Sequence, residues 1–423
     1  MSEAIVVFGG DGYIGWPLAL HLAWATDRKV VIVDNLVTRR LVASVGSDSL
    51  VPILSPPSRV AAYDRASGKQ NLVFVQADAR NPRQVDRIIW DYLPEAVVHL
   101  AQQRSAPFSM IDQEHALYTQ LNNVAANLNI MFSMMRHVPK AHLLKMGTMG
   151  EYGTPNIEIT EGSVEVERYG RKHLAMFPRA GQSWYHLSKI FDTHNVILAN
   201  KVSGLRATDV MQGVVYGCAT NEMVDDSLAT RFDFDGIWGT VINKYVVQAL
   251  VLNKLLIYGK GRQTRGFLSL YDSIECLSLL LEHPPSEGEY RVVNQIDETY
   301  DTVQLAERVQ RIAREFGLEV GMERVANPRV ESEEHFYKVE RSILPSIGFR
   351  RTKELDEVLR EIFQLVLANR ERAQKMKSLI APSVKWSDRK PVTSESFPLP
   401  AELLSRPQGE EVAEIARERA GSV

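Results

Sequence analysis

The chain of 423 residues carries 49 Lys and Arg against 52 Asp and Glu, which gives a formal net charge of −3 at pH 7. This balance excludes the basic footprint expected of a protein that binds nucleic acid or an anionic membrane surface. The most apolar stretch, residues 246–258, is interrupted by Asn253 and Lys254 and is too short to cross a bilayer. With 45% apolar and 24% charged residues, the chain has a globular composition, and we expect a cytoplasmic protein without nucleic-acid or membrane partners.

The two cysteines, Cys218 and Cys276, are far apart in the sequence and have no spacing typical of a metal or redox motif. They favour a reducing compartment without a disulfide framework. We interpret both as small buried side chains, and we expect no bound metal.

The first half of the chain alternates short β-branched segments with amphipathic ones. The expected strands include residues 5–8, 30–33, 72–76 and 96–100, and the expected helices between them include 16–25 and 85–92. Such alternation is typical of βαβ units, and the wholly apolar segment 30–33 fits a strand buried on both faces. The sequence therefore predicts an α/β fold, a doubly wound parallel (Rossmann) sheet with a smaller C-terminal α/β substrate-binding domain.

The change of rhythm along the chain predicts a division into domains. The expected parts are a cofactor-binding domain over 1–211, to which about 236–252 and 266–283 return, a mainly substrate-binding domain over 212–381, and an extension over 382–423. We expect the extension to be a peripheral arm or a subunit contact. Residues 36–70, which contain the segments PPS and SGK, are expected to be a loop-rich insertion.

A glycine-rich turn follows the first expected strand. Gly9, Gly12 and Gly15, with Tyr13 and Ile14 between the last two glycines, lie where this strand meets the start of a helix. Backbone N–H groups and the helix N-terminus at such a turn attract the pyrophosphate of a dinucleotide. A glycine pattern alone is weak, but the strand before it and the helix after it supply the required context.

The end of the second expected strand predicts which dinucleotide is bound. Asp34 lies at the distance where a carboxylate accepts hydrogen bonds from the adenosine ribose, and it would repel a 2′-phosphate. This favours NAD over NADP, although Arg39 and Arg40 follow closely and could bind a 2′-phosphate. Ala101 ends another expected strand, where a small side chain lets the cofactor lie against the backbone.

Tyr185 and Lys189 are four residues apart, which places both side chains on one face of a helix. An ammonium beside a phenol stabilises the phenolate and lowers the tyrosine pKa from about 10, which provides a base for a hydroxyl proton. This spacing is common, and alone it favours a structural role. With the glycine turn, and with Gly147-Thr148 at the end of the apolar segment 141–146, we expect Thr148, Tyr185 and Lys189 to form a catalytic set.

These motifs make the chain similar to the extended short-chain dehydrogenases/reductases, the NAD-dependent epimerase/dehydratase family. Within this group the chain resembles the UDP-sulfoquinovose synthases over residues 5–386. The motifs GGDGYIGW and YHLSK are shared with UDP-galactose 4-epimerases and nucleotide-sugar 4,6-dehydratases, whereas QRSAPFSMID, GTMGEYGTPN and NPRVESEEH are much narrower.

The resemblance implies an enzyme of sulfolipid biosynthesis that uses bound NAD to oxidise C4 of UDP-glucose. Loss of water across C5 and C6 follows, a sulfur nucleophile adds at C6, and the hydride returns to C4 to give UDP-sulfoquinovose. The implied partners are UDP-glucose or a related UDP-sugar, sulfite or a sulfur-donor protein, and further copies of the chain in a homodimer or higher homo-oligomer.

By this resemblance Thr148, Tyr185 and Lys189 carry the redox chemistry, while Arg104 and His186 hold the sulfur nucleophile and move protons near C6. The alternatives are a salt bridge for Arg104 and simple packing for His186. The implied substrate-binding residues are Arg104, Thr148, Met149, Gly150, Gln212, Arg265 and Arg329, of which the last two bind the diphosphate. The expected cofactor-binding residues are Gly9, Gly12, Tyr13, Ile14, Gly15, Asp34, Asn35, Arg39, Asp78, Ala101, Asn123, Tyr185 and Lys189.

The chain also departs from its relatives. Met149 and Gly150 stand where 4,6-dehydratases have an Asp-Glu pair, which disfavours an ordinary dehydratase and leaves the base at C5 unidentified. Gln102 and Met211 stand where a glutamate and an asparagine are expected in plant-type synthases. Two other functions stay open: a UDP-sugar 4-epimerase or other nucleotide-sugar modifying enzyme, and a non-catalytic dinucleotide-binding regulator.

Overall fold

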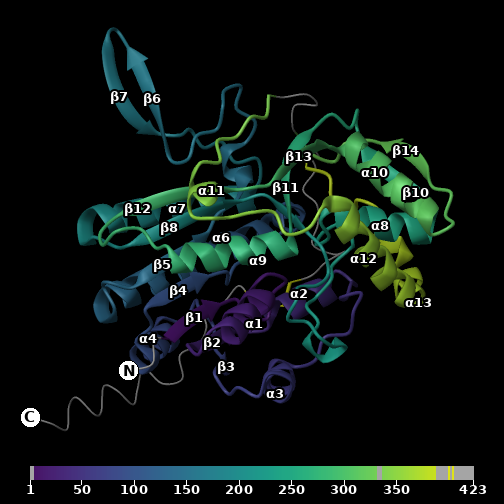
Figure 1. The fold of residues 1–423 in the computed structure, drawn as a ribbon. Coiled ribbons are helices and arrows are strands. Elements are labelled where there is room, and N and C mark those ends of the chain that lie inside the picture. The colour runs from purple at the N-terminus through teal and green to yellow at the C-terminus, as the bar shows by residue number, and fades with distance from the viewer. Residues whose placement is uncertain (1–3, 331–335, 387–398, 401–402, 404–423) are drawn as a thin grey trace, which may run out of the picture.

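The computed structural model describes residues 4–330, 336–386, 399–400 and 403, and its centre is a seven-stranded parallel sheet (Figure 1). The strands, in spatial order, are β12 (Tyr290–Gln295), β8 (Ala207–Gln212), β5 (His142–Met146), β4 (Ala96–His99), β1 (Ala4–Phe8), β2 (Lys29–Asp34) and β3 (Leu72–Gln76). The chain runs outward from β1 in both directions, so β1 and β4 flank the switch point, where such sheets form a crevice at their carboxyl ends. The predicted doubly wound sheet is confirmed.

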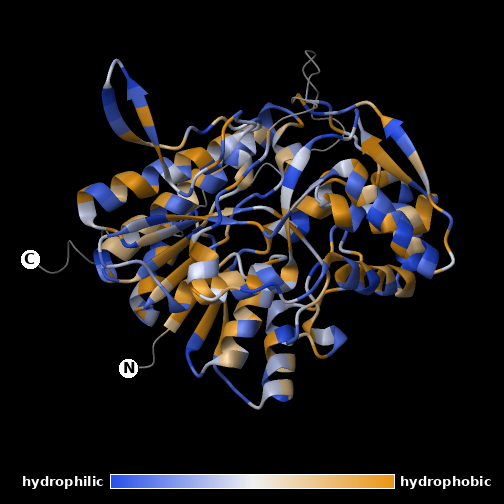
Figure 2. Cartoon of the chain, turned by 45° about the horizontal axis from the view of Figure 1, so that its top comes forward, coloured by the Kyte–Doolittle hydropathy of each residue, from blue (hydrophilic) through white to orange (hydrophobic). Residues whose placement is uncertain are grey.

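Helices cover both faces of this sheet. The helices α1 (Gly15–Ala25) and α9 (Leu270–Glu282) lie on one face, and α4 (Pro82–Tyr92), α6 (Gln113–His137) and α7 (Trp184–Ser203) lie on the other. Successive strand residues point to opposite faces, so Val7 and Ile32 join the core of the first face, whereas Val6 and Val31 join that of the second. The apolar strands between two helical layers are visible as orange segments in Figure 2.

The second half of the chain adds a smaller layer at the right of Figure 1. The strands β9 (Val214–Tyr216), β11 (Thr264–Ser269) and β13 (Glu298–Asp301) form a three-stranded sheet, and β10 (Lys254–Tyr258) pairs with β14 (Gly321–Val325). The strands β9, β10, β11 and β13 share an apolar core with α8 (Val241–Leu252), α10 (Thr302–Glu315), α12 (Leu355–Ala368) and α13 (Arg370–Lys375). Of the two later segments expected to return to the first domain, α9 packs on the large sheet, whereas α8 packs with α10 and α12.

The stretch 36–70 is not the loop-rich insertion that its composition predicts, because it contains the helices α2 (Val37–Ser44) and α3 (Pro56–Ser67). The PPS segment starts a helix: the Ser55 hydroxyl accepts a hydrogen bond from Ser58 N, and Pro56 occupies the first turn, where no intrahelical N–H bond is lost. The SGK segment ends the same helix, since Gly68 is its left-handed C-cap. Turn-forming residues served here as helix start and stop signals.

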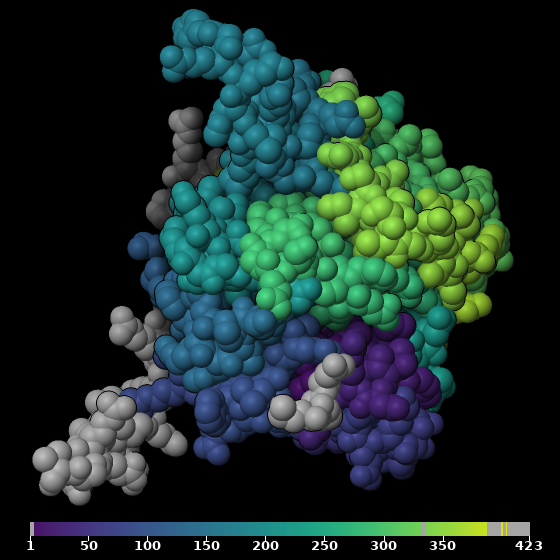
Figure 3. Space-filling view, turned by 60° about the vertical axis from the view of Figure 1, so that its left-hand side comes forward, coloured from purple at the N-terminus to yellow at the C-terminus, as the bar shows by residue number. Residues whose placement is uncertain are grey.

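A hairpin of β6 (Ser163–Arg168) and β7 (Arg171–Met176) projects from the body in Figures 1 and 3. The remaining short elements are α5 (Ala106–Ser109), α11 (Ile343–Ser346), η1 (Met149–Tyr152), η2 (Asp226–Leu228) and η3 (Lys377–Leu379). In the part of the chain that the structure describes, no helix has the length and apolar character needed to cross a membrane.

After η3 the chain returns to the first domain. Val384, Leu399 and Leu403 are buried in one cluster with Val37 and Leu41 of α2. The rest of the expected extension, 387–398, 401–402 and 404–423, lies outside the described residues.

Candidate active site

A cavity of about 390 Å³ opens where β1, β4, β5 and β8 end, between the large sheet and the second layer. Of the selected residues it is lined by Gly9, Gly12, Tyr13, Ile14, Gly15, Arg104, Thr148, Met149, Gly150, Tyr185, His186, Lys189, Gln212, Arg265 and Arg329. A smaller cavity shares Gly9 and Gly12 with it and is lined by Asp34, Asn35, Asp78 and Ala101. The fold thus brings predicted cofactor-binding, catalytic and substrate-binding residues to one crevice.

The glycine turn has the shape of a pyrophosphate cradle. Gly9 has φ +87°, and a Cβ atom there would lie 2.5 Å from the carbonyl carbon of Leu100. A Cβ atom on Gly15 would lie 2.2 Å from the Gly9 oxygen, whereas one on Gly12 would meet only that oxygen, at 3.2 Å. The helix α1 begins at Gly15 with no side-chain cap and no acidic residue in its first turn. Its first N–H groups therefore suit a dinucleotide pyrophosphate.

Asp34 and Asp78 lie together at the small cavity, at the ends of β2 and β3. The carboxylate of Asp34 accepts hydrogen bonds from Asp11 N at 2.9 Å and Leu36 N at 2.7 Å. Burial, with the charge of Asp11, raises the pKa of Asp34 to about 6. Burial also acts to raise the pKa of Asp78, but the hydrogen bonds and charge of Arg80 outweigh it and lower the pKa. Two carboxyl groups in this position suit the hydroxyl and amino donors of an adenosine.

Arg39 and Asn123, both expected to bind the cofactor, line neither cavity. Arg39 binds the Asp11 carboxylate through Nε at 2.7 Å and through a terminal nitrogen at 2.8 Å. Asp11 also pairs with Arg59, which is fully buried over the Trp16 ring. This ion cluster was not anticipated, because the partners of Asp11 are 28 and 48 residues away in the sequence.

Asn123 makes hydrogen bonds to two neighbouring segments. Its amide accepts a hydrogen bond from Gln103 N at 2.8 Å and donates to Gln103 O at 3.0 Å and to Ser188 Oγ at 2.9 Å. It therefore joins α6 and α7 to the segment after β4. Its neighbour Asn122 lines the small cavity instead.

Tyr185 and Lys189 lie one turn apart on α7, as predicted, and both face the main cavity. The Lys189 ammonium is 5.8 Å from the centre of the Tyr185 ring and donates to the Met146 carbonyl at 2.6 Å. Thr148 follows β5 and shares a hydrogen bond with Tyr185. A strand end and a helix start thus hold the three side chains around one point of the cavity.

The expected lowering of the Tyr185 pKa is wrong. Burial of the phenol raises its pKa, and the nearby carboxylate of Glu151 raises it further. The charge of Arg104 and the Thr148 hydrogen bond act in the opposite direction but do not outweigh burial. The Lys189 ammonium lies over the ring and donates to a backbone carbonyl. The four-residue spacing of Tyr185 and Lys189 therefore did not by itself determine the direction of the Tyr185 pKa shift.

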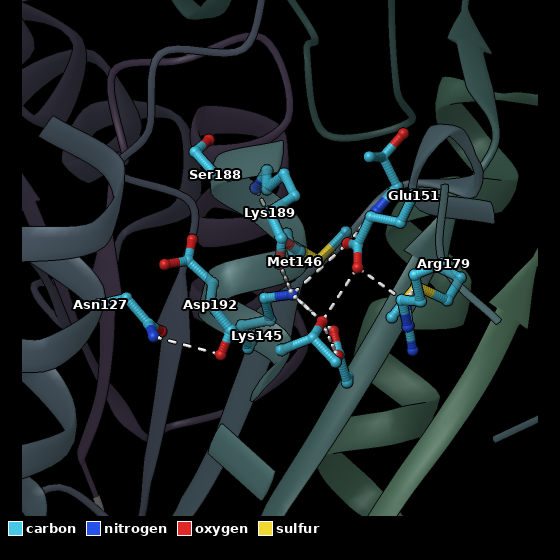
Figure 4. Close-up of polar contacts among 12 residues, drawn as sticks. Asn127, Lys145, Met146, Glu151, Arg179, Ser188, Lys189 and Asp192 are labelled. Carbon is cyan, nitrogen blue, oxygen red and sulfur yellow. Dashed lines mark hydrogen bonds and ion pairs between the residues drawn. The ribbon is translucent and has the colours of Figure 1, made fainter. Parts of the chain in front are cut away.

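Behind Lys189 lies a group of buried ionisable residues that sequence analysis missed (Figure 4). It consists of Lys145, Glu151, Arg179, Asp192 and Asp209, none of which lines the cavity. The signal was present, since Lys145 interrupts the apolar strand β5 and Asp209 interrupts the buried strand β8. Charged residues inside buried strands point to paired groups in the interior.

His186 lies directly over Gly150. A Cβ atom at position 150 would be 2.3 Å from His186 Nε2, so glycine there makes room for the imidazole. The buried Nδ1 atom of His186 has no hydrogen-bond partner among the described residues. Burial lowers the pKa of His186 to about 3, and the charges of Arg329 and Arg265 act in the same direction. The imidazole is therefore neutral and occupies space that a longer residue at position 150 would need.

Arg104 forms the salt bridge that was the alternative to a binding role. It pairs with the buried carboxylate of Asp233, donates to Trp238 O at 3.3 Å, and lines the main cavity. Asp233 also accepts hydrogen bonds from Arg231 at 2.9 Å, so two guanidinium groups share one carboxylate. Arg104 thus places a guanidinium group in the cavity wall, a group that suits an anion.

Arg265 and Arg329 reach the cavity from the second layer. The guanidinium group of Arg329 lies over the Trp386 ring at 5.1 Å, and Trp386 N donates to Pro328 O at 2.8 Å. Trp386, with Pro382 and Val384, also lines the cavity. The first residues of the segment expected to be a peripheral arm therefore form part of the pocket wall, which its composition did not indicate.

The fold and the crevice define a class of protein. Residues 5–294 match the model of the NAD dependent epimerase/dehydratase family, and the chain belongs to this family. A UDP-glucose 4-epimerase from Stenotrophomonas maltophila, solved with NAD and formylated UDP-arabinopyranose, has the same fold, with a TM-score of 0.68. It is 18% identical, and the match covers 88% of this chain and 99% of that one. NAD is the cofactor of this family, in agreement with the prediction.

Sequence comparison narrows the class. The UDP-sulfoquinovose synthase of Sulfolobus acidocaldarius is 46% identical over 389 residues, 92% of this chain and 98% of the relative. The chloroplastic UDP-sulfoquinovose synthase of Spinacia oleracea is 41% identical over 91% of this chain and 79% of the relative. Within its family the chain belongs with the UDP-sulfoquinovose synthases, as the narrow motifs predicted, and it is a nucleotide-sugar enzyme.

Proposed function

We propose that the chain converts UDP-glucose and sulfite to UDP-sulfoquinovose. The observation that carries this proposal is that the glycine turn, Thr148, Tyr185 and Lys189 line the same cavity as His186. The similarity to two UDP-sulfoquinovose synthases over nine-tenths of the chain supports the substrate and the product. When bound, NAD accepts a hydride from a sugar carbon and later returns it.

In the proposed reaction Tyr185 removes the proton of the sugar C4 hydroxyl while the hydride leaves C4. Thr148 holds the same hydroxyl by a hydrogen bond, and the Lys189 ammonium stabilises the phenolate. Because burial raises the pKa of Tyr185, the phenolate requires positive charge close to the ring. Lys189 and the cationic nicotinamide ring of NAD would supply that charge.

We assign the proton transfers at C5 and C6 to His186. Its imidazole is neutral, lines the cavity and stands over Gly150, close to the place where a dehydratase would carry an acidic side chain. A neutral imidazole can take the C5 proton and give it to the departing C6 hydroxyl, so that water leaves and the atoms balance. Arg104 is the cation proposed for sulfite or for the sulfur group of a donor protein.

Replacing His186 by asparagine is expected to separate the two halves of this reaction. Oxidation at C4 should stay within about 10-fold of wild type, whereas formation of sulfonated product should fall by about 100-fold or more, the usual size of a general acid–base contribution. Reduced nicotinamide measured by absorbance and product measured by mass spectrometry give the two rates. His194→Asn, at an exposed position of the same helix, is the matched control. Equal loss of both rates would contradict the assignment.

The UDP group is proposed to lie under the second layer. Arg265 and Arg329 would bind the diphosphate, because planar guanidinium groups pair with two oxygens at once. Gln212, Met149 and Gly150 also line the cavity, and we assign them to the sugar. The proposed division is therefore a cofactor domain over 1–211 and a nucleotide-sugar domain over 212–381, with residues 382–386 closing the pocket.

The direct test is incubation of the purified protein with UDP-glucose, NAD and sulfite. We expect a sulfonated nucleotide sugar that forms only when sulfite is present. Conversion of UDP-glucose to UDP-galactose without sulfite would instead favour the 4-epimerase alternative. Absence of any turnover would favour the non-catalytic regulator, although the retention of Tyr185, Lys189 and Thr148 at one point of the cavity speaks against it.

We also propose that the chain forms a homodimer through α6 and α7. Both helices expose large apolar side chains: Leu117, Leu121 and Phe132 on α6, and Trp184, Phe191, Leu198 and Val202 on α7. On α7 these residues are 7, 7 and 4 positions apart, so they form one stripe along the helix. A stripe of this kind on two neighbouring helices is typical of a subunit interface.

The double variant Phe132→Glu/Leu198→Glu is expected to be monomeric at micromolar concentration, where the wild type is dimeric. Light scattering coupled to gel filtration measures the mass directly. Leu174→Glu, at a position of the β7 hairpin that is 69% exposed, is the control for adding a charge to an exposed apolar site. A dimer that persists in the double variant, or a monomeric wild type, would rule out this interface.

A further inference from the structure

The buried residues behind Lys189 form a balanced set of charges. Lys145, Glu151, Asp192 and Asp209 are 0% exposed, and the side chain of Arg179 is 2% exposed. With Lys189 the set holds three basic and three acidic side chains (Figure 4), and burial raises the pKa of one of the acids, Asp192, to about 7. Burying a charge is costly unless it is paired, so each member needs the others. Only Lys189 of this set reaches the cavity.

Two lysines link the strand and the helix that carry the proposed catalytic residues. Lys189 of α7 donates to the Met146 carbonyl on β5 at 2.6 Å. Lys145 of β5 donates in the opposite direction, to the Lys189 carbonyl on α7 at 3.4 Å and to Thr193 Oγ1 at 2.8 Å. Thr148 comes two residues after β5 ends. This reciprocal pairing fixes the distance between Thr148 and the helix that carries Tyr185.

The anionic partners of Lys145 extend the same arrangement. Its ammonium lies 3.0 Å from Asp209 Oδ1 and 3.6 Å from Glu151 Oε1. Glu151 Oε1 in turn accepts the backbone N–H of Thr148 at 3.2 Å, and Glu151 Oε2 binds Arg179 at 2.7 Å. Lys145 is thus connected through one carboxylate to Thr148 and through one carbonyl to Lys189.

Ionisable groups face Lys189 from the elements around it. Lys145 lies on β5, Asp192 on the same helix, Glu151 on η1 and Asp209 on β8, and the neutral His99 lies on β4. Burial lowers the pKa of Lys189, and Lys145 lowers it further, while the three carboxylates act to raise it. The net direction is downward, and Lys145 is the cation that opposes the carboxylates.

We propose that Lys145 is a positioning residue for Tyr185 and Lys189, which acts from β5 on both the backbone and the charge of Lys189. This inference rests on the proposed roles of Tyr185 and Lys189 but not on the identity of the sugar product. Burial, together with the repulsion between the two ammonium groups, lets Lys189 exchange its proton at a pH below that of a free lysine. Lys189 can then gain or lose a proton when the Tyr185 phenol changes its charge during the reaction.

The test follows Lys189 itself, by NMR of the holoenzyme with ¹³C at lysine Cε. The Lys189 signal is assigned by its absence in Lys189→Arg. In Lys145→Met, Lys189 should titrate about one pH unit higher than in wild type, because a neighbouring positive charge has been removed. The alkaline limit of C4 oxidation should move in the same direction. Lys145→Arg keeps the charge and should restore the wild-type titration.

Two further variants keep the test decisive. Lys140→Met makes the same change at a lysine whose side chain is 80% exposed, and it should leave Lys189 unchanged. Lys145→Met/Asp209→Asn removes a cation and an anion together, so it leaves no unpaired Asp209 if the single variant fails to fold, and its upward shift should be smaller. A wild-type Lys189 with the ordinary lysine pKa of about 10.4, or an unchanged Lys189 titration in a folded Lys145→Met variant, would overturn the proposal. Neither result depends on whether a sulfonated sugar is formed.

Discussion

Replacing Tyr185 by phenylalanine is expected to lower the rate of UDP-glucose oxidation by about 1,000-fold, within the range typical of a lost general base. The phenol lies over Lys189, shares a hydrogen bond with Thr148 and lines the cavity beside the glycine turn. Phenylalanine keeps the ring and its packing but removes the phenol oxygen that is proposed to take the hydroxyl proton. Stopped-flow absorbance of reduced nicotinamide measures the step.

The control for this variant is Tyr169→Phe, the same chemical change in the turn of the β6–β7 hairpin, where the side chain is 89% exposed. It should oxidise UDP-glucose at the wild-type rate. Calorimetry should also show that Tyr185→Phe binds UDP-glucose within a few-fold of wild type, since the diphosphate contacts are proposed to lie elsewhere. A Tyr185→Phe rate within about 10-fold of wild type would remove the proposed role, because that loss is smaller than a catalytic base contributes.

Replacing Gly12 by valine is expected to weaken NAD binding by about 100-fold or more, which corresponds to the loss of nearly 3 kcal/mol. Gly12 lines both cavities, and a Cβ atom there meets only the Gly9 oxygen, so the branched side chain extends into the crevice. The adjoining backbone N–H groups would then be shielded from the pyrophosphate. Equilibrium dialysis of the stripped protein measures the affinity.

Gly321→Val provides the matched control for Gly12→Val. Gly321 is an exposed residue of β14, and the nearest atom to a Cβ there is 3.9 Å away. This variant should bind NAD as the wild type does. Thermal unfolding without NAD should give similar melting temperatures for both variants. If Gly12→Val retains wild-type NAD affinity, the cofactor does not lie on the glycine turn.

Local patterns were enough to predict the central architecture. Strands β1 to β4 follow from β-branched runs, and the crevice follows from the order of parallel strands, since such sheets bind ligands at their carboxyl ends. The PPS segment at the start of α3 led to a wrong prediction of a loop, because a proline in the first turn of a helix and a proline in a loop look alike in sequence. The packing of the second half of the chain was harder to predict, since α8 and α9 have similar apolar patterns but pack in different layers.

The candidate site was predicted where motifs are contiguous and missed where contacts are distant in sequence. Tyr185 and Lys189 are fixed by helix periodicity, whereas the pairing of Lys145 with Asp209 depends on two strands 64 positions apart. Trp386 reaches the cavity only because the chain returns from the second layer. The direction of the Tyr185 pKa shift was missed for a related reason: burial is a property of the whole fold.

In the proposed reaction the chain oxidises the sugar at C4, modifies C6 and returns the same hydride to C4. UDP-glucose carrying deuterium at C4 tests this directly, when it is incubated with the holoenzyme and sulfite and the product is examined by mass spectrometry and NMR. We expect UDP-sulfoquinovose that keeps the deuterium at C4. Sulfonated product that has lost the label to water, or labelled UDP-glucose recovered with no sulfonated product, would contradict it.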